Sequence, residues 1–314
     1  MHGDHVIEAR ELSRVYNGKR VVDTVSFRVP RGCVFGFLGR NGSGKTTTIR
    51  MLLGLTSPSA GSSTLLGENS RELSPSTRAR VGYITEEHRV ISWMTVAENG
   101  AFQATFYPRW SEKLFRSVTE HFRLKEGTRA VDLSRGERAG LALALTLAPE
   151  PELVIMDDPA LGLDPVARRA LVESMLYITR AQDRTIFFST HLLSDVERVA
   201  DHIAILDQSV LRACCPLEVF RDRVRCYVAT FPGEAPSVSG MRGLLQSSRN
   251  GRSIRVTCVE AGSEVRQELE RRGALEVELM ALGLEDAFVS YLEERGEKRP
   301  LLGLSESLQP MEVA

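Results

Sequence analysis

The chain has 314 residues, of which 42% are apolar and 26% charged, and its 40 basic and 41 acidic residues leave a net charge of −1. This length accommodates two average domains, and the apolar content excludes an intrinsically disordered chain. The balanced charge provides no general attraction to nucleic acid or lipid, so we expect no nucleic-acid partner.

The cysteines and the apolar stretches indicate the cellular compartment of the chain. Its five cysteines, an odd number without Cys-x-x-Cys spacing, predict free thiols in a reducing compartment and argue against a metal site. The opening MHGDHVIEAR lacks the basic and then apolar segments of a secretion signal, so we do not expect the chain itself to be secreted. Apolar stretches such as Cys33–Leu38 and Leu141–Ala148 are far shorter than the ~20 residues that cross a bilayer. We therefore expect a cytoplasmic chain, for which a role at the membrane would require a membrane partner.

In chain order, short apolar runs alternate with longer helical patterns up to about residue 220, which is typical of an α/β fold. The predicted strands are Val6–Arg10, Thr24–Val29, Cys33–Leu38, Val81–Ile84, Leu153–Asp157, Thr185–Ser189 and His202–Leu206. The predicted helices are Lys45–Leu53, Thr95–Thr105, Ser111–Phe122, Glu137–Leu147, Val166–Arg180 and Ser194–Ala200. Residues 95–148 show helical patterns without a strand, so we expect a helical insert, about 87–148, in a domain of residues 1–222.

The composition changes after about residue 222, where a second domain is expected. The predicted elements there are strands Arg225–Phe231 and Ile254–Glu260, helix Ser263–Arg271, strand Ala274–Met280 and helix Leu284–Glu294. Together they indicate a small α+β domain over residues 223–296. Residues 297–314 lack periodicity, and we expect a flexible tail.

The segment Gly39-Arg-Asn-Gly-Ser-Gly-Lys45-Thr46 fits the phosphate-loop pattern G-x-x-x-x-G-K-[ST]. An apolar strand leads into it and a helix begins at Lys45, so backbone N–H groups and the helix N-terminus can surround ATP phosphates. Lys45 would neutralise phosphate charge, and Thr46 would ligate Mg²⁺. The residues expected to bind the nucleotide here are Gly39, Asn41, Gly42, Ser43, Gly44, Lys45, Thr46 and Thr47.

Two adjacent acids, Asp157 and Asp158, follow the apolar run Leu153–Met156. An isolated Asp-Asp-Pro would often only end a strand, but a phosphate loop also needs an acid for its Mg²⁺ at the end of a neighbouring strand. We therefore assign Asp157 to the metal. Asp158 would face the γ-phosphate and polarise the attacking water.

With these motifs in order, the chain resembles the ATP-binding subunit of an ABC transporter over about residues 5–220. VGYITEEHRVISWMTVAEN (81–99) is similar to the family's glutamine-loop segment, which faces the permease. LSRGERAG (133–140) is similar to the LSGGQ signature, LVIMDDP to the Walker B strand, LGLD (161–164) to the D-loop and STH (189–191) to the switch histidine. The resemblance implies a P-loop NTPase core of the ABC ATPase type, with an antiparallel β subdomain and a helical insert.

The resemblance also implies roles for single residues. Tyr16 corresponds to the aromatic residue that stacks on adenine, although it could instead pack on the core. His191 corresponds to the histidine that contacts the γ-phosphate, and Asp164 to the D-loop acid at the dimer seam. Signature residues contact the ATP that is held by a second subunit, and they are Ser134, Arg135, Gly136 and Glu137.

Four positions depart from the family pattern, and one of them is Glu137, which stands in place of the glutamine of LSGGQ. Glu86 stands in place of the loop glutamine, where a carboxylate can still ligate Mg²⁺ or a water. Asp158 stands in place of the usual Glu, and its shorter side chain predicts slow turnover, because a misplacement of ~1 Å can cost ~100-fold in rate. Arg135 stands in place of a glycine, where its charge lies near the γ-phosphate or points outward; the sequence does not decide between these.

The resemblance implies that two such subunits bind ATP between them, close on binding and reopen on hydrolysis, and so drive a separate integral membrane permease from the cytoplasmic face. GLEDAFVSYLEER (283–295) is similar to the SLED-type helix of subunits paired with ABC-2-type exporters, which favours export, although it also fits a generic amphipathic helix. The alternatives are a soluble ABC ATPase and a regulatory module that hardly hydrolyses its ATP.

Overall fold

The computed structural model describes residues 5–182, 184–259 and 263–293. The chain divides into two compact units between Cys214 and Cys215, slightly before residue 222, where the composition of the sequence changes. The sequence-based expectations for residues 294–314 lie outside the described residues.

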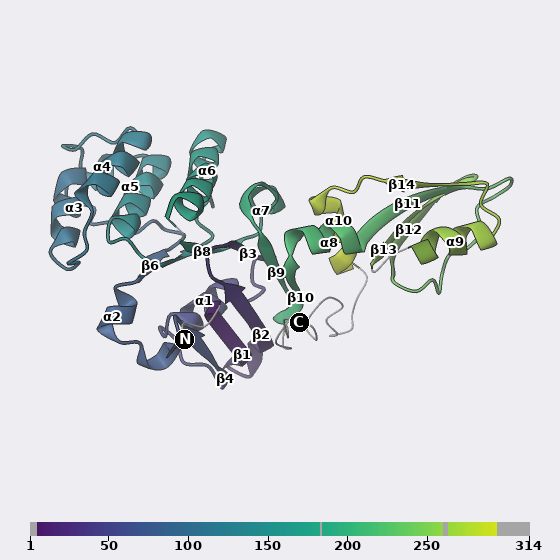
Figure 1. Cartoon of the computed structure of the whole chain (residues 1–314), viewed down its shortest axis with the longest axis horizontal. Coiled ribbons are helices and arrows are strands. Elements are labelled where there is room, and N and C mark those ends of the chain that lie inside the picture. Colours follow the sequence, from purple (N-terminus) through teal and green to yellow (C-terminus); the bar gives the residue numbers. More distant parts are fainter. Residues whose placement is uncertain (1–4, 183, 260–262, 294–314) are drawn as a thin grey trace, which may run out of the picture. The chain divides into compact units, whose positions relative to one another are not determined.

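The first unit contains a six-stranded sheet with the strand order β10-β9-β3-β8-β7-β6 (Figure 1). These strands are β3 (Val34–Gly39), β6 (Val81–Ile84), β7 (Leu153–Asp157), β8 (Thr185–Thr190), β9 (His202–Asp207) and β10 (Val210–Pro216). Neighbouring strands from β9 to β6 are parallel. Every residue of β3, β7 and β8 is buried, which explains their nearly continuous apolar sequences. The carboxyl ends of these three strands therefore lie at one edge of the sheet.

A smaller antiparallel sheet, of order β2-β1-β4-β5, belongs to the same unit. Its strands are β1 (His5–Tyr16), β2 (Lys19–Pro30), β4 (Ala60–Leu65) and β5 (Glu68–Asn69). The two sheets share one hydrophobic core, in which Phe27 of β2 stacks on Phe37 of β3 with ring centroids 5.6 Å apart. Helix α1 (Lys45–Leu52) buries Ile49, Met51 and Leu52 in this core, so packing fixes the start of α1 against the sheet.

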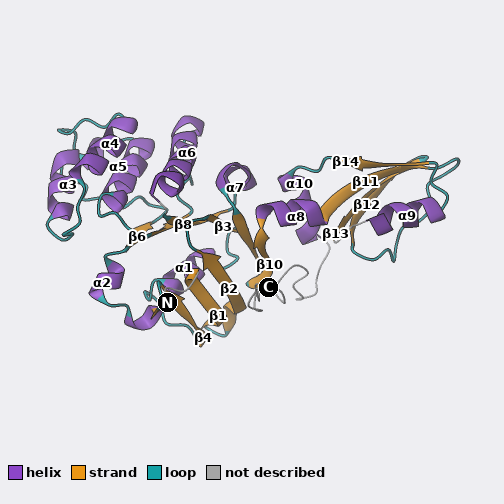
Figure 2. Cartoon of the chain, in the orientation of Figure 1, coloured by secondary structure: helices purple, strands orange, loops and turns teal. Residues whose placement is uncertain are grey.

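Residues 95–148 form three helices with a core of their own (Figure 2). The helices are α3 (Val96–Ala104), α4 (Glu112–His121) and α5 (Arg135–Leu147). Phe115 of α4 packs on Gly100 of α3 so closely that a β-carbon built there would lie 2.6 Å from the ring. Three further helices of the unit are α2 (Pro75–Arg78), α6 (Pro165–Gln182) and α7 (Leu193–Val199).

The second unit is an antiparallel sheet of order β12-β13-β11-β14 with three helices. Its elements are α8 (Leu217–Arg223), β11 (Val224–Thr230), β12 (Leu244–Asn250), β13 (Ser253–Val259), α9 (Ser263–Arg271), β14 (Glu276–Met280) and α10 (Leu284–Glu293). The rings of Phe220 in α8 and Tyr291 in α10 meet edge to face at 5.6 Å, so α8 packs with this unit.

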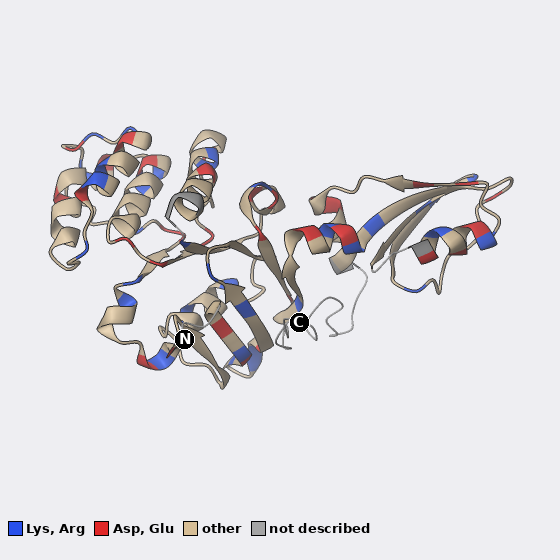
Figure 3. Cartoon of the chain, viewed as in Figure 1, with Lys and Arg blue, Asp and Glu red and all other residues tan. Residues whose placement is uncertain are grey.

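Basic and acidic residues are interspersed along both units (Figure 3). In the part of the chain that the structure describes, every helix is too short or too polar to span a bilayer.

Candidate functional site

The phosphate loop joins β3 to α1, and its glycines are required by close backbone contacts. A β-carbon on Gly39 would lie 2.4 Å from the carbonyl oxygen of Leu206 and 2.5 Å from Ser43 Oγ. Gly44 has a φ of +109°, and a β-carbon there would lie 2.4 Å from the carbonyl oxygen of Val21. Any side chain at either position would push the loop away from the sheet edge, so this backbone path depends on glycine.

Lys45 is turned into the loop that precedes it. Its side chain is 6% exposed, and Nζ donates hydrogen bonds to the carbonyl oxygens of Gly39 (2.8 Å) and Arg40 (3.3 Å). Burial lowers the pKa of Lys45, while the carboxylates of Asp158 and Asp157 act in the opposite direction. The loop thus holds a cation above the sheet edge, where phosphate oxygens could replace its carbonyl partners.

Asp157 ends β7 and lies beside this loop. Its Oδ1 accepts hydrogen bonds from Thr46 Oγ1 at 3.1 Å and from Ser189 Oγ at 2.8 Å. The carboxylate is 4% exposed. A hydroxyl and a carboxylate that converge next to a phosphate loop form the oxygen set that Mg²⁺ takes together with nucleotide phosphates. The hydroxyl of Ser43 is buried and lacks a partner among the described residues, which is a further inward-facing oxygen that the folded chain leaves unused.

Asp158 has a left-handed backbone, with φ +48°. Its N–H donates to Ser189 Oγ at 2.9 Å, and His191 Nδ1 lies 3.2 Å from both of its carboxylate oxygens. Because an ionised carboxylate only accepts hydrogen bonds, Nδ1 of His191 carries the proton in this pair. The backbone turn therefore aims the acid at the switch histidine and away from the course of β7.

Part of the phosphate loop lines a cavity of about 350 Å³ together with Glu86 and Asp158, whereas Gly39, Ser43 and Asp157 do not line it. Its predicted members are Asn41, Gly42, Gly44, Lys45, Thr46, Thr47, Glu86 and Asp158. Glu86 reaches it because it follows β6, whose neighbour in the sheet is β7. Val21 and Leu161 also line the cavity and were not predicted as site residues; Leu161 begins the LGLD segment, whereas Val21 belongs to no motif.

The signature residues lie at the start of α5 and do not line this cavity. Ser134 accepts a hydrogen bond from the N–H of Glu137, whose side chain accepts one from the N–H of Ser134, and this is a complete capping box. Arg135 lies over the D-loop of its own chain, because a β-carbon on Gly162 would lie 2.2 Å from Nη1. A β-carbon on Gly136 would lie 2.6 Å from that of Ala167. The signature turn and the D-loop therefore form one joined surface.

Asp164 and Tyr16 have local contacts of their own. Asp164 Oδ1 accepts hydrogen bonds from the N–H groups of Val166 and Ala167, at 2.9 and 3.0 Å, so it caps the start of α6. Tyr16 is 41% exposed at the end of β1, with the guanidinium carbon of Arg14 4.3 Å from its ring centroid. This exposure argues against the core-packing alternative for Tyr16.

His88, which no sequence motif singled out, connects the glutamine-loop segment to the turn that follows β7. The ring is 1% exposed, and Nε2 donates to the carbonyl oxygen of Pro159 at 2.7 Å. Burial lowers the pKa of His88, and the nearby charges of Arg135 and Arg138 lower it further. A histidine in a loop gave no signal of this contact, because its partner is 71 residues away.

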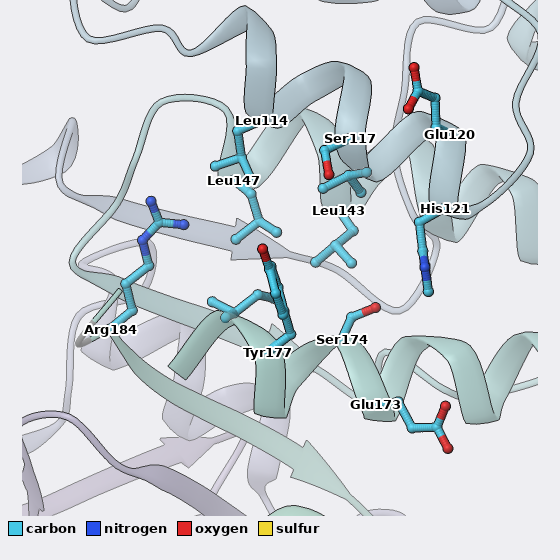
Figure 4. A pocket seen from close by; sticks show the side chains of 12 residues that line it. Leu114, Ser117, Glu120, His121, Leu143, Leu147, Glu173, Ser174, Tyr177 and Arg184 are labelled. Atoms are coloured by element: carbon cyan, nitrogen blue, oxygen red, sulfur yellow. The ribbon is translucent and has the colours of Figure 1, made fainter. Parts of the chain in front are cut away.

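A second, larger hollow of about 530 Å³ lies between α4, α5 and α6 (Figure 4). Leu114, Leu143 and Leu147 provide much of its lining, and Tyr177 and Arg184 also face it. None of the residues assigned to nucleotide or Mg²⁺ lines this hollow. The smaller, more polar cavity at the phosphate loop is therefore the site with the relevant chemistry.

Comparison with known proteins agrees with this geometry. The family model described as ABC transporter matches residues 22–161. The chain is 33% identical over 225 residues to the bacitracin transport ATP-binding protein BcrA of Bacillus licheniformis, an alignment that covers 71% of this chain and 74% of that protein. It is 32% identical over 302 residues to the Nod factor export ATP-binding protein I of Rhizobium sp. (strain N33), which covers 93% and 98% of the two chains.

A solved structure of an ATP-binding subunit of an ABC transporter superposes with a TM-score of 0.62 at 30% identity, over 69% of this chain and 92% of that one. The relatives thus share both the sequence and the fold that carry the phosphate loop. The chain belongs to the ABC transporter family, as one of its ATP-binding, ATPase subunits.

Proposed function

We propose that this chain hydrolyses Mg²⁺–ATP between two copies of itself, or between itself and a close relative, to power a separate membrane permease that exports its substrate. The observation that carries the proposal is the cavity lined by Lys45, Thr46 and Asp158, beside which Asp157 accepts a hydrogen bond from Thr46. Each of these four side chains would have a task in the transfer of the γ-phosphoryl group to water.

The metal would be held by Thr46 and Asp157, with Glu86 at the same cavity. The oxygen donors present suit Mg²⁺, which usually binds one or two protein oxygens together with substrate phosphates. When bound, Mg²⁺ neutralises phosphate charge. Lys45 would add a second positive charge at the phosphate loop.

Asp158 would accept a proton from the attacking water, with His191 Nδ1 3.2 Å from its carboxylate oxygens. A general base of this kind depends on geometry, and Asp is one methylene shorter than the usual Glu. We therefore expect Asp158 to support hydrolysis at a low rate.

The position of the signature supports the proposed dimer. Ser134 and Arg135 are exposed and do not line the nucleotide cavity of their own chain. The capped start of α5 is a suitable anion site, and it would complete the ATP site of a second chain. ATP binding would then close the dimer, and hydrolysis would reopen it.

The permease would dock on the helical part of the first unit. Trp93, Phe102 and Phe106 are 74, 43 and 63% exposed there, and the rings of Phe102 and Phe106 meet edge to face at 5.1 Å. Exposed aromatic residues of this kind often serve as interface anchors. Transport is supported by the relative named for bacitracin transport, and export by the relative named for Nod factor export. In this proposal the chain acts on the cytoplasmic face of the cell membrane.

The second candidate is an ATP-gated regulatory or soluble ABC ATPase with very slow hydrolysis, which Asp158 favours. A tagged full-length chain, purified from detergent-solubilised membranes, separates the two. Transport predicts that a multi-spanning membrane protein co-purifies and stimulates Mg²⁺-dependent ATP hydrolysis. It also predicts that Trp93→Asp breaks this association, whereas Tyr177→Asp, at a side chain 68% exposed on α6, does not. Turnover that is unchanged by any membrane fraction would support the regulatory alternative.

A further inference from the structure

Ser189 lies at the end of β8, directly opposite Asp157 in the parallel register with β7. It is fully buried. Its hydroxyl donates its hydrogen to Asp157 Oδ1 at 2.8 Å and accepts the N–H of Asp158 at 2.9 Å. We propose that Ser189 is a positioning residue that fixes both acids of the ATP site through this single hydroxyl. The inference rests on the proposed function of the same site.

The bond to Asp157 would determine how that carboxylate faces Mg²⁺. A serine hydroxyl has one hydrogen, and here that hydrogen is given to Oδ1. The same oxygen accepts the Thr46 hydroxyl at 3.1 Å, so two hydroxyls fix the rotation of the carboxylate beside the phosphate loop. Hydrogen bonds from outside the ligand set orient metal-binding carboxylates in this way, and their loss typically lowers metal affinity or activity by about 10- to 100-fold.

The hydrogen bond to the N–H of Asp158 stabilises an uncommon backbone conformation at that residue. A φ of +48° is unfavourable for a residue with a β-carbon. The buried N–H of Asp158 has Ser189 Oγ as its acceptor, so the hydroxyl removes the cost of an unpaired donor in the turned conformation. That conformation aims the carboxylate at His191, and the hydroxyl therefore acts on the general base as well as on the metal ligand.

Ser189→Ala tests the inference in the full-length chain. We expect kcat for ATP hydrolysis to fall by about tenfold or more, and the Mg²⁺ concentration for half-maximal rate to rise by a similar factor. A second readout does not depend on turnover: Mg²⁺ should tighten binding of a fluorescent ATP analogue less in the variant than in the wild type. Binding of the same analogue in EDTA should be unchanged, because Ser189 does not line the nucleotide cavity.

The chain offers a matched control on the same strand. Thr185 is also fully buried, lies on the same face of β8, and its hydroxyl accepts the N–H of Gly32 at 2.9 Å. Thr185→Val removes a buried hydroxyl of this kind away from the acids, so it should lower the melting temperature and leave the Mg²⁺ dependence unchanged. Ser189→Thr, which keeps the hydroxyl, should restore much of the wild-type Mg²⁺ response.

The outcomes separate this inference from the proposed function. If the wild type shows no Mg²⁺-dependent hydrolysis, the proposed function fails. If the wild type hydrolyses ATP and Ser189→Ala keeps its Mg²⁺ response in both readouts, the positioning role is wrong. An equal loss in Thr185→Val would also overturn it, because the effect would then be general damage to β8. If Ser189→Ala does not fold, the near-isosteric Ser189→Cys, with its weak thiol donor, serves in its place with the same expectations.

Discussion

His191 Nδ1 lies 3.2 Å from both carboxylate oxygens of Asp158, so these two side chains form one pair within a single chain. The pair joins the carboxyl ends of β7 and β8 beside the phosphate loop. Its geometry makes Asp158 the residue on which the rate of hydrolysis should depend most.

Asp158→Glu should raise kcat, by up to about 100-fold, because the longer side chain extends the acid toward the water. Glu tolerates a left-handed backbone less well than Asp, so the same change should lower the free energy of unfolding by about 1 kcal/mol. Steady-state ATP hydrolysis and urea unfolding measure the two effects. The control is Asp158→Asn, whose side chain has nearly the same shape but cannot accept the proton. It should retain ATP binding and lose hydrolysis. A rate for Asp158→Glu at or below that of the wild type would contradict the account.

Arg135 and Gly162 should be energetically coupled. Gly162→Ala introduces a β-carbon at φ +69° and into the space of the Arg135 guanidinium, so it should be destabilising by about 1–2 kcal/mol from the backbone alone and by more with the clash. In an Arg135→Ala background only the backbone cost remains. A double-mutant cycle from chemical unfolding should therefore give a coupling energy of at least about 0.5 kcal/mol. Additive effects would mean that the guanidinium does not occupy this position in solution.

Two capping boxes allow the structural and functional roles of Ser134 to be separated. Ser134 caps α5 and Thr95 caps α3 with the same pair of hydrogen bonds. Replacing either residue with Ala should cost about 1 kcal/mol of stability. Only Ser134→Ala should also weaken ATP-dependent dimerisation, measured by light scattering in an Asp158→Asn background. Equal dimerisation of the two variants would leave Ser134 with its capping role alone.

His88 should make stability depend on pH. Burial lowers the pKa of the folded-state imidazole below its ordinary value. Above about pH 6.5 the ring is neutral in both the folded and the unfolded chain, and the stability is fully present. As the pH falls below that value, the unfolded state takes up a proton first and the fold loses up to about 1.4 kcal/mol per pH unit.

In His88→Gln the amide can still donate to the carbonyl oxygen of Pro159, but it does not titrate. Its free energy of unfolding should therefore change less between pH 7 and 5.5 than that of the wild type, as followed by urea unfolding at each pH. Part of the slope should remain, because burial also lowers the pKa of His202. Equal slopes for the two proteins would show that His88 does not titrate in this way.

The phosphate loop and the Walker B acids could be predicted from the sequence because each motif is contiguous and follows a fully buried strand. Contacts between residues that are far apart in the sequence could not be predicted in this way. Ser189 stands in the STH segment, but its contacts with Asp157 and Asp158 could not be predicted, because only the parallel register of β7 and β8 brings Ser189 opposite Asp157. Arg135 fitted two orientations in the sequence, and nothing there indicated that its exposed side chain lies over Gly162 of its own chain.

Several strands were missed for a similar reason. β12 (LLQSSRN) is polar and exposed over most of its length and lies at a sheet edge, so it lacks the alternation of a half-buried strand. β4 (AGSSTL) is likewise largely polar. β1 continues to Tyr16, well past the predicted Arg10, because a left-handed residue at Glu11 and shifts in register interrupt its pattern without ending the strand.

The central claim is that ATP is bound between two chains, and cysteine crosslinking tests it most directly. Asn41 of the nucleotide cavity and Ser134 are both exposed, whereas four native cysteines are buried and Cys214 is half-buried. Chains with Asp158→Asn and either Asn41→Cys or Ser134→Cys are mixed and treated with a short bifunctional thiol reagent. The parent chain and Thr95→Cys serve as controls. The account predicts that the Asn41→Cys and Ser134→Cys chains form a crosslinked mixed dimer when Mg²⁺–ATP is present and not when it is absent. Mixtures in which the parent chain or Thr95→Cys replaces Ser134→Cys should give no such product. A mixture that binds ATP and never forms this product would contradict it.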